Sequence, residues 1–211
     1  MTLDSGITVI FIGHGSRRET SNKELATLVS QFRARHPCYR TVLCFVELAK
    51  PSFNQTILWE AGREECQKVI LLPVFLFSSR HVKNDIPLVV SKVRQTYPNK
   101  EIICADAMKS SLSLINLARK RLQDFCTGNH EALLVVGRGS SDPDSNGEFE
   151  KIARLIFEKE NFDSFHSAYV GITGPSVAEQ LNLISKLRPK KLIVLPYFLF
   201  HGRLIDQLNE T

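Results

Sequence analysis

The sequence predicts an α/β protein made of two similar lobes, each a parallel sheet flanked by helices. The first observation is that strand-like runs, apolar on both faces, alternate with stretches whose apolar residues recur at helix spacing. This alternation is typical of a parallel sheet covered on both sides. The second observation is an internal repeat with a period of about 124 residues, which predicts two lobes of the same fold.

Four strands and three helices are expected in the first repeat. Each apolar helix stripe follows a strand-like run, and the stripes begin at Leu25, Ile86 and Leu114. Asp85 precedes the second stripe and is expected to be its N-cap. The strand-like runs cover residues 7–13, 41–48, 68–77 and 101–107.

The second repeat replays this order. ALLVVGRGS aligns with TVIFIGHGS, AYVGITGPS with CFVELAKPS, and LIVLPYFLF with VILLPVFLF. The polar link CTGNHE suggests a domain boundary, with a lobe carrying the catalytic groups at 1–127 and a substrate-holding lobe at 128–211. Because Thr211 corresponds to about residue 88 of the first copy, we expect the second lobe to be shortened and C-terminally incomplete.

Composition and charge restrict the class of partner. The net charge of +5 favours anionic ligands, but no basic stripe or reading helix suggests nucleic acid. No apolar run is long enough to span a bilayer, and the first residues lack the basic region of a secretory leader. Five scattered cysteines without a C-x-x-C pair indicate reduced thiols. We therefore expect a cytoplasmic protein that binds an acidic small molecule and has no membrane partner.

Three side chains are candidates for metal or proton chemistry. His14 follows the first predicted strand, Glu47 ends the second, and His81 lies just past the third. Ligands of open parallel sheets bind at the carboxyl ends of the strands. Two imidazoles and a carboxylate suit a divalent ion such as Fe²⁺, Co²⁺ or Ni²⁺, and they equally suit proton transfer near neutral pH.

The repeat tests whether these three groups belong together. Arg138 takes the place of His14, and Gly171 and Leu204 take the places of Glu47 and His81. The surrounding glycines, serines and prolines are retained in both copies. All three candidate groups are lost together while the scaffold stays, which favours a joint functional role over three separate structural roles.

Residues beside these motifs are candidates for binding an anionic substrate. An arginine between two glycines can pair with a carboxylate through two parallel hydrogen bonds, although a surface ion pair is the alternative for Arg138. Solvated surface charge is the alternative for the basic residues near the histidines. The predicted substrate-binding set is Ser16, Arg17, Arg80, Arg138 and Ser140.

The motifs GHGSRR, FVELAKPS and LPVFLFSSRHVKNDIP resemble those of the class II chelatases, specifically the long sirohydrochlorin chelatases of the cobalamin and sirohaem pathways. GRGSSDPDSN and LPYFLFHGRLIDQL are similar to that family's second half, where arginine replaces histidine. The resemblance implies a chelatase-like fold and ATP-independent insertion of Co²⁺ or Fe²⁺ into sirohydrochlorin, a tetrapyrrole with many carboxylates. It also implies His14 and His81 as metal-handling and proton-accepting residues, assisted by Glu47.

These expectations leave some alternatives open. The metal ion is expected as a substrate, with no permanently bound cofactor, and imidazole and carboxylate accept cobalt and iron alike. A non-catalytic carrier of metal or tetrapyrrole is the first alternative function, and a phosphohydrolase in which His14 accepts phosphate is the second. The protein is expected to be a monomer or a homodimer.

Overall fold

The computed structural model describes residues 6–78, 80–128 and 130–209, and it confirms the α/β fold with two parallel sheets. Contacts divide the chain into two compact units. Unit 1 runs to Met108 and includes Phe200–Gly202, whereas unit 2 comprises Lys109–Leu199 and the chain from Arg203 onward. Among the described helices, none combines the length and the apolar composition that crossing a bilayer requires.

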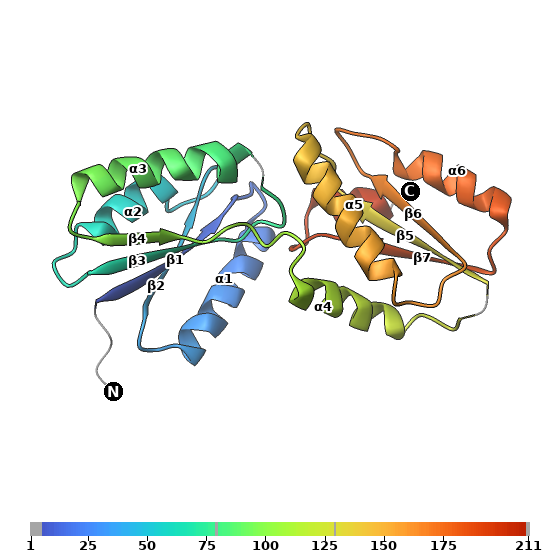
Figure 1. The fold of residues 1–211 in the computed structure, drawn as a ribbon, viewed down its shortest axis with the longest axis horizontal. Coiled ribbons are helices and arrows are strands. Elements are labelled where there is room, and N and C mark those ends of the chain that lie inside the picture. The colour runs from blue at the N-terminus through green and yellow to red at the C-terminus, as the bar shows by residue number, and fades with distance from the viewer. Residues whose placement is uncertain (1–5, 79, 129, 210–211) are drawn as a thin grey trace. The chain divides into compact units, whose positions relative to one another are not determined.

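The sheet of unit 1 has four parallel strands in the order β2-β1-β3-β4 (Figure 1). The strands are β1 (Ile7–Gly13), β2 (Arg40–Phe45), β3 (Lys68–Pro73) and β4 (Glu101–Cys104). The helices of this unit are α1 (Glu19–Arg35), α2 (Phe53–Ala61) and α3 (Ile86–Thr96), and α3 is preceded by the π-helical turn η1 (His81–Asp85).

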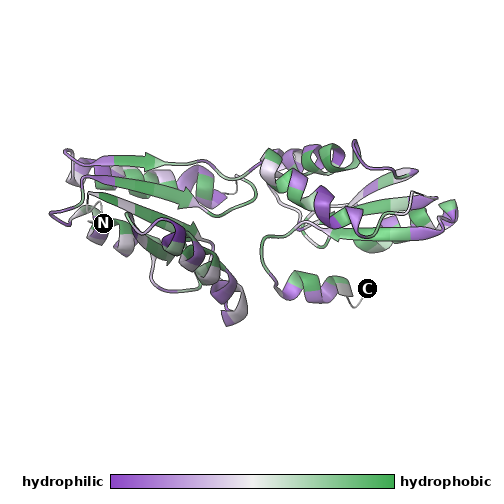
Figure 2. Cartoon of the chain, turned by 90° about the horizontal axis from the view of Figure 1, so that it is seen from below, coloured by the Kyte–Doolittle hydropathy of each residue, from purple (hydrophilic) through white to green (hydrophobic). Residues whose placement is uncertain are grey.

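Helices pack on both faces of this sheet at β1, which explains why that inner strand is a continuous apolar run. Ile10 and Ile12 of β1 are fully buried in a core shared with α2 and α3. The alternate residues point to the other face, where the ring of Phe11 lies 5.0 Å from that of Phe32 in α1. Burying each such side chain contributes about 1.5–3 kcal/mol, so the apolar strands in Figure 2 hold the unit together.

Unit 2 has three parallel strands in the order β6-β5-β7, with β5 in the centre. Every residue of β5 is buried. Within the described residues this sheet has no counterpart of β4. The strands are β5 (Glu131–Gly137), β6 (Ser164–Tyr169) and β7 (Lys191–Pro196), and the helices after them are α5 (Pro143–Phe157), α6 (Val177–Leu187) and α7 (Arg203–Asn209).

The compact units do not divide where the sequence repeat divides. The predicted boundary lay between residues 127 and 128, but the contacts place α4 (Leu112–Gln123) in unit 2, and the units separate after Met108. The physical reason is burial: α4 packs against α5 and buries Ile115, Ala118 and Leu122. The last helix of the first repeat therefore completes the core of the second unit.

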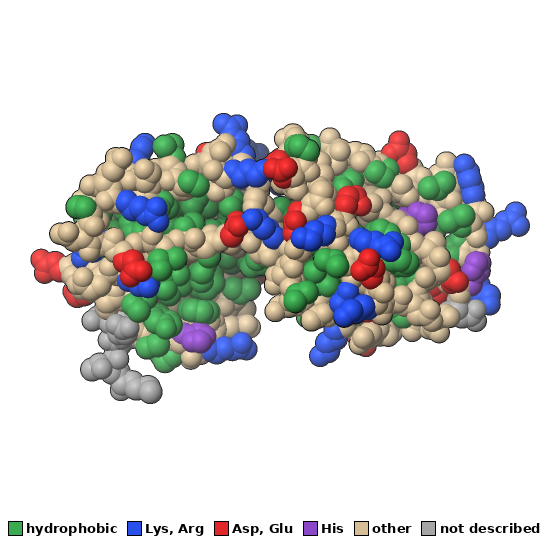
Figure 3. Space-filling model, in the orientation of Figure 1, with side chains coloured by type: hydrophobic (Ala, Val, Ile, Leu, Met, Phe, Trp, Pro, Cys, Tyr) green, Lys and Arg blue, Asp and Glu red, His purple; other side chains and the backbone are tan. Residues whose placement is uncertain are grey.

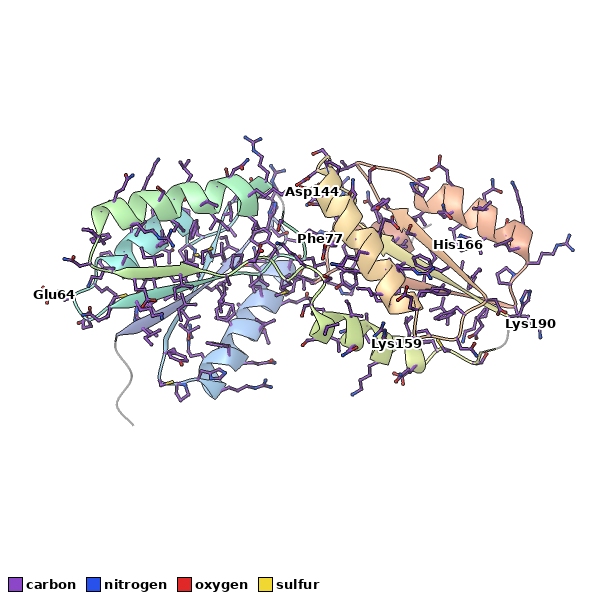
Figure 4. All side chains as sticks on the ribbon, viewed as in Figure 1. Glu64, Phe77, Asp144, Lys159, His166 and Lys190 are labelled. Atoms are coloured by element: carbon purple, nitrogen blue, oxygen red, sulfur yellow. The ribbon has the colours of Figure 1, made fainter. Side chains whose placement is uncertain are left out.

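The corresponding face of unit 1 is more open. Hydrophobic side chains gather there beside α1 in Figure 3, and Ile103 of β4 and Leu28 of α1 are 40% and 41% exposed. His166 lies in β6 and is half-buried (Figure 4). The apolar alternation of β6 is weak because only its last two residues are buried.

Candidate metal-handling site

The three candidate groups lie at the carboxyl edge of the sheet in unit 1, as expected. Gly13 and Phe45 are paired at the ends of β1 and β2, so His14 and Glu47 leave the sheet on neighbouring strands. His81 is the first residue of η1, which follows β3 on the other side of β1. Chain direction and strand order alone thus bring three distant segments to one place.

A close backbone approach fixes the first two groups against each other. The backbone N–H of Glu47 donates to the carbonyl oxygen of His14 at 3.0 Å. Gly15 adopts a φ of +93°, and a Cβ at this position would lie 1.8 Å from the carbonyl oxygen of Glu47. Only glycine fits both the left-handed conformation and the contact. The glycine after His14 therefore sets the spacing between the imidazole and the carboxylate.

The reactive atoms converge on one carboxylate oxygen. Nε2 of His14 lies 3.4 Å from Oε1 of Glu47, and Nε2 of His81 lies 4.0 Å from the same oxygen. The two imidazole rings meet edge to face, with centroids 5.0 Å apart. One ligand atom from each residue can be chosen so that all three lie within 4.8 Å of one another.

The other nitrogen of each ring is already engaged, which determines the tautomer. Nδ1 of His14 lies 3.1 Å from the carbonyl oxygen of Gly15, and Nδ1 of His81 lies 2.7 Å from Oδ2 of Asp85. Carbonyl and carboxylate oxygens only accept, so each Nδ1 donates its proton. In the neutral rings Nε2 therefore carries a lone pair for a metal ion or a proton.

This arrangement suits a divalent ion that is held and then released. The side chains of His14, Glu47 and His81 are 37%, 46% and 22% exposed, so an ion can enter and leave from solvent. Donors about 2.1 Å from a tetrahedral ion lie about 3.4 Å apart, so small side-chain movements would close the three groups around it. Two nitrogens and one oxygen suit iron, cobalt, nickel or zinc.

The two predicted serines hold their own loops. The Ser16 hydroxyl accepts from the backbone N–H of Arg18 at 3.0 Å, and the Ser140 hydroxyl accepts from that of Asp142 at 3.0 Å. Asn22 clamps the first loop by bonding the N–H and the carbonyl of Ser16 at 3.0 and 2.8 Å. Asn146 does the same for Ser140 at 2.9 and 2.7 Å. These contacts explain both serines without a ligand.

The three predicted arginines point to solvent-accessible surfaces. Arg17 and Arg80 belong to unit 1, beside the two histidines in the sequence, and Arg138 belongs to unit 2. All three are exposed, and within the described part of the chain none forms an ion pair with a carboxylate. Their guanidinium groups can therefore take an anionic ligand without breaking an existing pair.

The second repeat preserves the scaffold of the site without its reactive groups. Gly139 has a φ of +83°, and a Cβ there would lie 2.2 Å from the carbonyl oxygen of Gly171. The backbone N–H of Gly171 donates to the carbonyl of Arg138 at 3.1 Å, as Glu47 does to His14. Leu204 lies in α7, where His81 lies in η1 in the first repeat.

Two features of the site were not predicted from the sequence. Asp85 occupies the N-cap position of α3 as expected, but its backbone is helical, its side chain makes no cap hydrogen bond, and its carboxylate bonds the ring of His81. The signal was its position four residues after His81, the spacing of facing side chains on a helix. The clamping asparagines were the second omission, and their signal was the shared position six residues after each loop serine.

Comparisons with known proteins show which family the chain belongs to. The chain matches the family model described as CbiX at residues 8–125 and 132–211. It is 31% identical over 217 residues to a protein of Priestia megaterium named sirohydrochlorin cobaltochelatase, spanning 96% of this chain and 67% of that protein. A protein of the same organism named sirohydrochlorin ferrochelatase is 29% identical over 205 residues, with coverages of 96% and 76%.

Solved structures share the fold. The structure of SirB from Bacillus subtilis with Fe³⁺ matches with a TM-score of 0.82 at 23% identity, covering 97% of this chain and 81% of that one. A structure of the sirohydrochlorin chelatase SirB from Bacillus subtilis subspecies spizizenii in complex with cobalt matches with a TM-score of 0.72 at 22% identity, with coverages of 97% and 80%.

Proposed function

Because this chain belongs to the CbiX family, we propose that it is a metal chelatase that inserts a divalent cobalt or iron ion into sirohydrochlorin. The observation that carries the proposal is the convergence of His14, Glu47 and His81, whose ligand atoms lie within 4.8 Å of one another. The product of such an enzyme feeds cobalamin or sirohaem biosynthesis. The metal ion is a substrate and not a resident cofactor.

The overall reaction exchanges one divalent ion for two protons. Two pyrrole N–H bonds of the macrocycle break, four nitrogens take up the ion, and two protons leave. The protein must therefore supply ligands that replace the water around the ion, and bases that accept protons as the ion is transferred. One set of lone pairs can serve both needs if the ion leaves as the protons arrive.

The geometry of His14 and His81 supports this double role. Each ring holds its Nδ1 proton in a hydrogen bond and presents Nε2 toward Glu47. The two Nε2 atoms and Oε1 of Glu47 hold the ion first. When the ion moves into the macrocycle, the two lone pairs become free to accept the pyrrole protons. The Glu47 carboxylate stabilises the imidazolium that forms.

Exposed arginines supply the recognition of an acidic substrate. Arg138, Arg17 and Arg80 carry no competing carboxylate partner among the described residues, and guanidinium pairs bidentately with carboxylate. We assign them to the peripheral carboxylates of the tetrapyrrole. Ser16 and Ser140 contribute through the loops that they order.

An absorbance assay tests the function directly. Sirohydrochlorin is mixed with Co²⁺ or Fe²⁺, and the spectral change is followed with and without the protein. Conversion above the uncatalysed rate supports the chelatase and reveals the preferred ion. Tight stoichiometric binding of either ligand without turnover would instead make the protein a carrier and overturn the proposal.

Variants connect the activity to the site. His14→Ala and His81→Ala are each expected to abolish insertion and to leave binding of the tetrapyrrole largely intact. The exposed His36 at the end of α1 provides the matched control, and His36→Ala should retain full activity. Near-normal turnover in both site variants would remove the histidines from the mechanism.

A further inference from the structure

We propose that Asp85 is a positioning residue that holds the His81 ring in the orientation and tautomer needed to bind the metal ion. The inference rests on the proposed function and adds a residue to it. Oδ2 of Asp85 accepts the Nδ1 proton of His81 at 2.7 Å, a shorter contact than the 3.1 Å between Nδ1 of His14 and the carbonyl of Gly15. Hydrogen-bonded carboxylates are the usual partners of metal-binding imidazoles.

The local backbone explains why this aspartate serves the ring and not the helix. His81 and Asp85 begin and end the π-helical turn η1, and the backbone N–H of Ile86 donates to the carbonyl of His81 to close it. Because η1 runs directly into α3, Asp85 has helical dihedrals and makes no side-chain cap. Its carboxylate lies over the preceding turn, beside the imidazole. Such π-helical turns are frequent at functional sites.

The orientation of the His81 ring depends on the contact with Asp85 more than the orientation of the His14 ring depends on the contact with Gly15. Nδ1 of His14 bonds the backbone carbonyl of Gly15, which is fixed by the loop, whereas Nδ1 of His81 bonds a side chain. Rotating the His81 ring by half a turn would put carbon Cδ2 in the place of Nδ1 and carbon Cε1 in the place of Nε2, so both contacts would be lost. Only the observed orientation places Nε2 4.0 Å from Glu47, and the bond to Asp85 selects it.

The repeat indicates that the fold does not require a carboxylate here. The counterpart of Asp85 is Leu208 in α7, which packs against the core of unit 2. The acid is thus present where the histidine is present, and both are leucines in the other copy. Asp85 is 45% exposed, so its ion pair contributes little to stability. A role in the site accounts for it better than a role in folding.

Binding of Co²⁺ alone, measured by calorimetry and by the visible absorption of the bound ion, tests this assignment without the tetrapyrrole. Asp85→Ala is expected to weaken Co²⁺ binding by about 10- to 100-fold and to alter the absorption spectrum. Asp85→Asn is expected to restore most of the affinity, because its amide oxygen can still accept the Nδ1 proton. Both variants should melt within about 2 °C of the parent protein.

Glu158→Ala is the matched control. Glu158 forms an i,i+4 pair with Arg154 at 3.0 Å and is 46% exposed, like Asp85, but it lies in unit 2. Its loss should leave Co²⁺ affinity unchanged. Equal affinity in Asp85→Ala and the parent, or equal losses in the alanine and asparagine variants, would overturn the proposal. So would a loss of affinity that simply follows a fall in melting temperature.

Turnover separates this inference from the proposed function. In a working chelatase, Asp85→Ala should lower kcat at least about tenfold with little change in the KM for sirohydrochlorin. If the parent protein shows no turnover at all, the proposed function fails. The Co²⁺ affinities of the three proteins still decide the role of Asp85 in that case.

Discussion

The loops after β1 and after β5 have the same backbone and opposite chemistry. In each, a glycine with positive φ packs against the backbone two residues beyond the neighbouring strand, and an asparagine clamps a serine. The first loop carries His14 beside Glu47, and the second carries Arg138 beside Gly171. The backbone conformation of the strand-end loop is therefore the same in both repeats, whereas the reactive side chains differ.

This difference is the basis of the division of labour that we propose for the two lobes. Imidazole lone pairs of the first lobe can bind cations or protons, whereas the permanent positive charge of Arg138 in the second lobe can bind anions. A metal ion and a carboxylate-rich macrocycle make these two opposite demands. Substitutions that make one lobe resemble the other should therefore break the comparison most directly.

The largest effect is expected when the first lobe receives the residues of the second. His14→Arg, Glu47→Gly and His81→Leu should each reduce metal insertion by about 10²- to 10⁴-fold, because each removes a donor atom or base. Turnover of sirohydrochlorin with Co²⁺ measures the loss. Gly171→Ala is the matched control in the second lobe, because its Cβ would meet no atom within 4 Å. Its activity should equal that of the parent.

Substitutions at Gly15 and Gly139 should lower the unfolding free energy equally but affect metal binding differently. Gly15→Ala and Gly139→Ala should each destabilise their unit by about 3 kcal/mol, since each places a Cβ against a carbonyl oxygen in a left-handed conformation. Thermal unfolding checks this equality. Co²⁺ binding should fall at least about tenfold only in Gly15→Ala. Loss of Co²⁺ binding in both variants would show that the lobes are not independent.

Substitution of the two clamping asparagines should have a smaller effect, and the effect should be equal in the two lobes. Asn22→Ala and Asn146→Ala each remove two hydrogen bonds that hold a loop serine. We expect each to cost about 2 kcal/mol of unfolding free energy, because partly buried backbone groups lose their partners. Chemical denaturation measures both. A cost confined to one variant would contradict the equivalence of the two scaffolds.

The smallest effect is expected for Arg138, which we assign to the carboxylates of the substrate. Arg138→Ala should raise the KM for sirohydrochlorin about two- to fivefold and leave kcat unchanged, because an exposed charge pair contributes little free energy. The increase should shrink as salt is added, since screening already weakens the pair in the parent protein. Steady-state kinetics at two ionic strengths check this. A fall in kcat instead would place Arg138 in the chemistry.

Much of the fold could be predicted because buried parallel strands leave a continuous apolar signal. The positions of the strand ends could not. The runs 41–48 and 68–77 were read as strands, but β2 and β3 stop at Phe45 and Pro73. Their partner β1 ends at Gly13, and its chain turns away at Gly15, where φ is +93°, so regular strand pairing stops although single backbone bonds such as that from Glu47 to His14 continue. Apolar composition continues beyond this point because Val74 and Phe75 are still buried.

The site was predictable in part for a similar reason. Comparing the repeats singled out His14, Glu47 and His81 without any knowledge of distance, and the structure brings these groups together. The spacing of four residues places Asp85 near His81, but only the π-helical turn shows that its carboxylate bonds the ring and makes no cap of α3. The hydroxyl of Ser16 was read as a ligand group since a sequence does not show that the loop already uses it.

The transfer of α4 from the first repeat to the second unit has a consequence for synthesis on the ribosome. Residues 112–123 are made before β5, so this helix must wait, with Ile115 and Leu122 exposed, until α5 has been translated. Domains usually fold in the order in which they emerge. Here α4, which packs on the core of the later unit, emerges first. A fragment that begins at residue 128 would lack this helix. An independently expressed second unit should therefore start near Lys109.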